Sequence, residues 1–104
     1  MTNFVLVYTG GGMPESEAEQ ATVMAAWGAW YEGLGAAIVD GGNPFGASKH
    51  LSASGVGDGP VSSPPATGYT IIAADSLDAA VAKAQDHPHL KYGGQVSVYE
   101  TFQM

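Results

Sequence analysis

Between residues 68 and 88 the chain reads Gly68-Tyr69-Thr70-Ile71-Ile72-Ala73-Ala74-Asp75-Ser76-Leu77-Asp78-Ala79-Ala80-Val81-Ala82-Lys83-Ala84-Gln85-Asp86-His87-Pro88. The β-branched and aromatic residues at its start predict a strand. Asp75 is expected to cap the helix that follows, with Asp78 three residues on as in a capping box. Pro88 ends this helix because proline cannot continue it. An apolar stripe at helical spacing predicts one buried helix face: Leu77, Ala80, Val81 and Ala84.

A strand and a longer helix are predicted before this stretch. The strand is Phe4–Tyr8, followed by a glycine-rich turn over Thr9–Gly12. The helix is Pro14–Leu34, with Pro14 at its first position and three glutamates near its positive end. An apolar ridge runs along the helix at Met24, Trp27, Tyr31 and Leu34, and Val23 and Trp30 widen it.

The remaining elements complete a β-α-β-insert-β-α-β order. A second strand is predicted over Ala36–Asp40 and a last strand over Gln95–Phe102, while residues 43–67 form a Gly/Ser/Pro-rich insert. Within the insert, short strands at Lys49–Ser52 and near Val61 are expected to bracket the turn Gly57–Pro60. The order predicts one domain over residues 1–104, with an α+β ferredoxin-like fold of four antiparallel strands and both helices on one face.

Composition excludes several kinds of function. The 104 residues include ten acidic residues, three lysines, no arginine and no cysteine, and the net charge is −7. This balance argues against nucleic acid, anionic membranes and polyanionic substrates as partners. The absence of cysteine excludes disulfides and thiolate chemistry. The apolar run at Phe4–Tyr8 is too short for a signal or a membrane span, so a cytoplasmic protein is the expectation.

Several motifs follow one another in an order that is typical of a known family. They are Ile71–Ala80 followed by His87-Pro88, then Gly93-Gly94-Gln95-Val96, with Phe4–Gly11, Trp27 and Asp40-Gly41-Gly42 upstream and Asp58-Gly59-Pro60 in the insert. Together they resemble the YCII-related family, in its DGPF branch. The resemblance implies a ferredoxin-like subunit that dimerises into an α/β barrel. It also implies that the insert is a hairpin beside a cleft.

The resemblance and the residues together suggest a site. In the enzyme-like branch of that family, a histidine on the first helix pairs with an aspartate before the proline that ends the second. Here the first helix has no histidine, and His87 precedes Pro88. We expect His87 to act as a general acid–base group, protonated by the negative end of the helix, unless it only caps that end. Asp58 is its candidate partner, unless it only forms a turn.

Trp27 and Tyr31 are the candidate substrate-binding residues, because an aromatic ridge beside a sheet could stack an aromatic molecule. The alternative is that the ridge is core. No metal and no cofactor are expected, since His87 and His89 would need a third ligand such as His50 or Asp58.

Three functions stay open. The first is a small cofactor-independent enzyme that uses a histidine in a cleft on a small, aromatic molecule. The second is a non-catalytic ligand-binding or accessory homodimer, and the third is a protein that mainly associates with a partner. Fold analogy does not separate them.

A homodimer through the sheet is expected because both faces of the central strands are apolar. Phe4, Leu6 and Tyr8 share one face, and Val5 and Val7 share the other. Two helices can cover only one face, and a second copy is the simplest cover for the other. The competing explanation is that the insert folds back as a lid.

Overall fold

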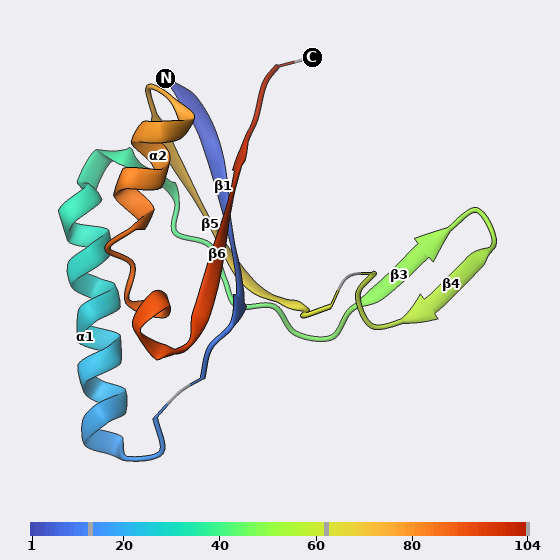
Figure 1. Ribbon diagram of the computed structural model, residues 1–104, viewed down its shortest axis with the longest axis horizontal. Helices are drawn as coiled ribbons and strands as arrows, with labels where there is room; N and C mark the ends of the chain where they lie inside the picture. The colour runs from blue at the N-terminus through green and yellow to red at the C-terminus, as the bar shows by residue number, and fades with distance from the viewer. Residues whose placement is uncertain (13, 62, 104) are drawn as a thin grey trace.

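The computed structural model describes residues 1–12, 14–61 and 63–103 and has the predicted ferredoxin-like α+β fold (Figure 1). Its main sheet is antiparallel with the strand order β2-β5-β1-β6, so the two strands predicted to be central are central. The elements are β1 (Thr2–Gly10), α1 (Glu17–Leu34), β2 (Ile38–Asp40), β3 (Lys49–Ser52), β4 (Gly55–Asp58), β5 (Ala66–Ala74), α2 (Leu77–Ala84) and β6 (Gly94–Glu100), with 3₁₀ helices η1 (Gly35–Ala37) and η2 (Pro88–Tyr92).

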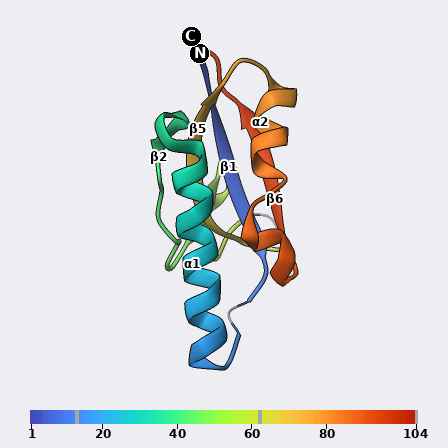
Figure 2. The same cartoon turned by 90° about the vertical axis from the view of Figure 1, so that its left-hand side faces the viewer.

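Both helices lie against one face of this sheet, as predicted (Figure 2). The core forms between them, because side chains alternate along a strand and every second residue of β1 and β5 points toward the helices. Its buried apolar residues are Phe4, Leu6, Tyr8, Val23, Trp30, Ile72, Ala74, Ala80 and Ala84. Val5 and Val7 point to the opposite face, which no helix covers.

A serine caps the N-terminus of each helix, and neither serine is the residue at which the sequence predicted the helix to begin. Ser16 caps α1 by accepting a hydrogen bond from the Glu19 N–H at 3.1 Å, so Pro14 lies before the helix. Ser76, not Asp75, caps α2 by accepting from the Ala79 N–H, also at 3.1 Å. In both places a serine hydroxyl lies three residues before an orphan amide, and this geometry decides the cap.

The predicted apolar faces of the helices pack against the core, but their members are buried unequally. On α1 the buried positions are Val23 and Trp30, while Met24 is 62% exposed. On α2 the small Ala80 and Ala84 are buried, and Leu77 and Val81 lie at the margin. The small side chains let α2 approach the sheet closely, and the larger ones are left at its rim.

The insert contains a hairpin whose register differs from the prediction. Strand β3 lies at Lys49–Ser52 as expected, but its partner β4 is Gly55–Asp58 and not a strand near Val61. The residues predicted as a turn therefore lie in and just after β4. The turn is at residues 53–54 instead, followed by Gly55 at φ 140°, a conformation that favours glycine.

Other element ends differ by a few residues. Thr9 and Gly10, predicted as turn, continue β1 and pair with β6, which ends at Glu100 rather than Phe102. The start of the predicted second strand and the loop after Pro88 are both 3₁₀ helix. No helix in the described ranges is long and apolar enough to cross a membrane.

Candidate functional site

A cavity of about 470 Å³ opens between α1, one end of the main sheet and the loop that follows β2. Glycines at 10–12, 41–42 and 68 form much of its rim, and they bring backbone close to the space. Trp27 and Tyr31, the predicted substrate-binding residues, both lie in its wall. The aromatic residues and the histidine in this wall include Tyr8, Trp27, Tyr31, His89 and Tyr92.

Three hydroxyl groups beside the cavity form a hydrogen-bond network that ends at one backbone carbonyl. The Tyr8 hydroxyl donates to Thr70 Oγ1 at 2.6 Å, and the Thr70 hydroxyl donates to the Gly41 carbonyl at 3.1 Å. The Tyr31 hydroxyl donates to the same carbonyl at 3.0 Å. Burial raises the pKa of Tyr8, so this side chain stays a neutral phenol near neutral pH. All three protons are therefore used within the protein, and the tyrosine oxygens keep free lone pairs.

His89 is the histidine that lines the cavity. Its Nε2 lies 2.9 Å from the Thr9 carbonyl, which can only accept, so Nε2 carries a proton and donates it. Glycines enclose the ring: a Cβ on Gly11 would lie 2.7 Å from Cε1, and one on Gly94 would overlap the imidazole. Nδ1 is on the side of Gly11, which also lines the cavity, and makes no hydrogen bond among the described residues.

His87, predicted as the catalytic residue, is fully buried behind this wall. Its Nδ1 accepts a hydrogen bond from the backbone N–H of His89 at 3.0 Å, which holds the start of η2. Its Nε2 has no hydrogen-bond partner in the described chain. The ring instead meets the indole of Trp27 edge-on at 4.2 Å between centroids and that of Trp30 at 4.3 Å.

The expectation that the helix end protonates His87 is wrong. Burial lowers the pKa of His87 to about 4, and the neighbouring His89 lowers it further, so the ring is neutral at pH 7. Helix α2 ends at Ala84, and the chain carries His87 into the aromatic cluster instead of leaving it over the last carbonyls. Loss of hydration therefore outweighs the helix dipole.

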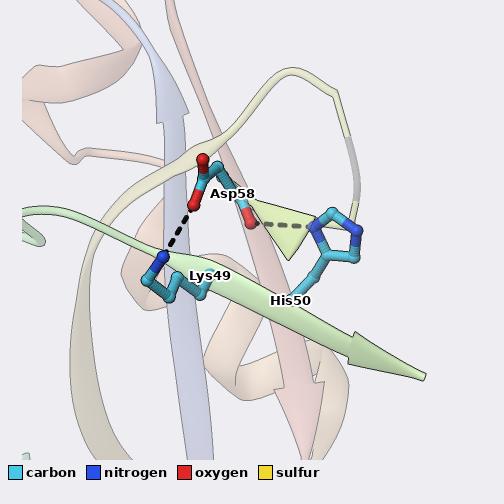
Figure 3. Close-up of polar contacts among 4 residues, drawn as sticks. Lys49, His50 and Asp58 are labelled. Atoms are coloured by element: carbon cyan, nitrogen blue, oxygen red, sulfur yellow. Dashed lines mark hydrogen bonds and ion pairs between the residues drawn. The ribbon is translucent and has the colours of Figure 1, made fainter. Parts of the chain in front are cut away.

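Asp58 does not meet His87 within the chain. It lies on the hairpin, which extends away from the main sheet, and its carboxylate pairs with Lys49 Nζ at 2.6 Å (Figures 1 and 3). The Asp58 side chain is 90% exposed. His50 is on the same hairpin, with Nδ1 3.1 Å from the Gly59 carbonyl. No three potential ligands among the described residues are close enough to hold a metal ion.

Sequence reasoning considered His89 as an acid–base group and as a possible metal ligand, preferred His87, and missed the place of His89 in the cavity wall. The contact that fixes it joins residues 80 apart, which no local pattern reveals. The sequence feature that could have indicated the position of His89 is the presence of glycine at positions 11 and 94. Both are needed because a side chain at either position would occupy the space of the imidazole.

The fold and the cavity define a small ferredoxin-like α+β protein with an aromatic-lined cavity. No family model matches the chain, and no curated protein matches it. Among solved structures it is similar to 5-chloro-2-hydroxyhydroquinone dehydrochlorinase from Burkholderia phenoliruptrix AC1100, in a complex with 2,5-dihydroxybenzoquinone. The TM-score is 0.57 at 21% identity, and the match covers 97% of this chain and 95% of that one. This likeness supports the fold.

Proposed function

We propose that the protein binds a small, planar, hydroxylated aromatic molecule in the cavity, and that His89 exchanges a proton with it without a cofactor. The observation that carries the proposal is the position of His89 in a cavity wall that also contains Trp27 and Tyr31. A bare Nδ1 can accept a proton from a ligand hydroxyl, as a general base does, and return it to another ligand atom. The protein would then be a distant member of the YCII-related family.

The polar groups around the cavity favour a ligand that donates hydrogen bonds. The Tyr8 and Tyr31 protons are already used, so their oxygens offer acceptor sites. A phenol or hydroquinone can donate to them, whereas a carboxylate or a phosphate cannot. The net charge of −7 and the absence of arginine also disfavour an anion. The solved structure with the similar fold holds 2,5-dihydroxybenzoquinone, which shares with the proposed ligands a small planar six-membered ring bearing oxygens.

We assign His87 a positioning role. Its Nδ1 holds the backbone of His89, and its ring supports Trp27 from behind. A neutral, fully buried imidazole can fix these groups without taking part in proton transfer. No hydrogen bond or ion pair joins either histidine to a carboxylate among the residues described. This observation keeps a second candidate function in view, a binding protein that does no chemistry.

The test is a titration with hydroquinone and catechol, with benzoate and phenyl phosphate as anionic comparisons, in which tryptophan fluorescence reports binding. We expect saturable binding of the hydroxylated compounds, at least tenfold weaker in Trp27→Ala and unchanged in Val39→Ala, an exposed site outside the cavity. Exchange of ring hydrogens with deuterium, lost in His89→Gln while binding persists, would establish proton transfer. Binding without exchange would favour the non-catalytic function, and no binding would overturn both.

We also propose that the uncovered face of the main sheet pairs with a second copy. The residues of β1, β5 and β6 that point to this face carry no charge, although the chain has ten acidic residues. They include Val5, Val7 and Ile71, whose burial against a symmetric partner would be favourable. Light scattering at micromolar concentration should give twice the chain mass of 10.6 kDa, and a clean monomer would exclude this pairing.

A further inference from the structure

The hairpin of β3 and β4, called the arm below, extends away from the rest of the protein on the side of the sheet that the helices leave uncovered (Figure 1). The Cα radius of gyration is 15.1 Å, above the roughly 13 Å of a compact chain of this length. The arm therefore does not fold back over the sheet, and the alternative of a lid within one chain is wrong.

The arm carries an exposed apolar pair that no described residue outside the arm buries. Leu51 and Val56 lie opposite each other across the two strands, and their side chains are 73% and 66% exposed. A two-stranded hairpin alone is marginally stable in water. The Lys49–Asp58 ion pair closes its base but supplies little stability because both groups are exposed.

The direction of the arm is set where it leaves the sheet. Phe45 stacks on Tyr69 with ring centroids 5.7 Å apart and planes 20° apart. The Phe45 N–H donates to the Thr67 carbonyl at 2.8 Å. Pro44 and Gly68 form an isolated antiparallel β-bridge. Tyr69 points to the uncovered face, because it alternates with the buried Thr70 along β5. The arm thus starts from the same face that the proposed dimer would bury.

We propose that the arm reaches across this dimer and packs Leu51 and Val56 against the second copy. The inference rests on the proposed sheet-to-sheet pairing and adds a second contact to it. A second copy that covers the uncovered face would lie on the same side of the sheet as the arm, within its reach. In a two-fold dimer the contact is made twice, once by each arm.

The charge pattern favours a second copy over another kind of partner. A basic protein would be matched by acidic side chains, yet the outward positions of β1, β5 and β6 have none. At the edge of this face the Asp40 carboxylate of β2 already accepts a hydrogen bond from the Tyr69 hydroxyl at 3.3 Å, so the apolar positions of β1, β5 and β6 are left for a second copy to cover.

Two matched variants test the arm. Leu51→Asp with Val56→Asp places two charges on its apolar side, and Ser52→Asp with Ser54→Asp places the same two charges at its turn, where the serine hydroxyls are exposed. Sedimentation over a concentration series gives the dimer dissociation constant. We expect it to rise at least tenfold for the first variant and less than twofold for the second. The helix signal in far-UV circular dichroism should be unchanged in both.

An independent measurement avoids any effect of the added charges. Because the chain has no cysteine, Val56→Cys carries a single spin label. Its mobility should be restricted in the dimer and freed by dilution to monomer, whereas a label at Ser54→Cys should be mobile throughout. A wild-type monomer, or a mobile label at position 56 in a dimer, would overturn the proposal. Neither result bears on ligand binding in the cavity, which the fluorescence titration measures separately.

Discussion

The helix-covered body and the arm contain similar apolar residues but treat them differently. In the body Phe4 and Leu6 are fully buried between the sheet and the helices, whereas in the arm Leu51 and Val56 face water. The difference lies in the number of layers, since a helix or a sheet must bury its apolar face against another element. The arm has one layer, so its apolar pair becomes buried only if a second molecule supplies the other layer.

The histidines of the two regions show the same contrast. His87 lies among Trp27, Trp30 and Tyr8 and loses its hydration, so its pKa falls. His50 lies along the arm, with one nitrogen at the Gly59 carbonyl and the ring partly open to solvent. Burial by tertiary packing, and not sequence position, decides which histidine loses its hydration.

The largest expected effect is on stability. It compares Trp30, which is buried in the body, with Val61, which is exposed just beyond the arm. Trp30→Ala removes a buried indole whose N–H donates to the Lys83 carbonyl at 3.0 Å, and should cost about 3–5 kcal/mol of stability. Val61→Ala truncates a side chain that is mostly exposed and should change stability by less than about 0.5 kcal/mol. Urea denaturation of both variants measures the difference. Equal losses would contradict the division into a packed body and a one-layered arm.

A titration of stability with pH tests the buried state of His87. Its pKa is about 4 in the folded protein against 6.5 in the unfolded chain. Between these values the unfolded chain binds more protons, so stability falls as pH falls from 6.5 toward 4. At about 1.4 kcal/mol for each pKa unit the loss is about 3 kcal/mol.

The matched variant is His87→Asn, whose side-chain oxygen can still accept from the His89 N–H but does not titrate. Its stability curve should be flatter than that of wild type between pH 6.5 and 4. Subtracting one curve from the other removes the contribution of the carboxylates, which is common to both. Parallel curves would mean that His87 is hydrated in the folded protein.

The hydroxyl network gives a smaller expected effect. Thr70→Val keeps the shape of the side chain but leaves the Tyr8 hydroxyl without its acceptor, and should cost about 2 kcal/mol. The corresponding change in the arm, Ser52→Ala, removes an exposed hydrogen bond to Ser54 and should be nearly neutral. Thermal unfolding compares the two. A neutral Thr70→Val would indicate that water replaces the threonine hydroxyl inside the body.

The fold was predictable because strand and helix periods, and the order of the elements, are local properties of the sequence. The predictions failed where neighbouring residues compete for one role. Asp75 and Ser76 are both good caps, and only the observed backbone geometry selects Ser76. The arm register was missed because glycines at Gly55, Gly57 and Gly59 leave no alternation of side chains to read.

The site was predictable only in part for a related reason. Trp27 and Tyr31 were identified because they lie on one ridge of a helix, which spacing alone reveals. The neutral state of His87 depends on rings from other elements, and the place of His89 depends on Thr9 at the far end of the chain. Such contacts are set by tertiary packing, so local pattern could name these histidines but not assign their roles.

The smallest expected effect is at the base of the arm. Lys49 and Asp58 form an exposed ion pair, and such pairs contribute about 0.2–1 kcal/mol because water screens them. The arm can open without unfolding the body, so amide hydrogen exchange of β3 and β4 is the suitable measurement. Asp58→Asn should speed exchange there up to about fivefold at low salt, with no change in β1 or β5. In 1 M salt wild type and variant should converge, since the screening length falls to about 3 Å. A difference that persists in high salt would mean that Asp58 holds the arm by hydrogen bonding and not by charge.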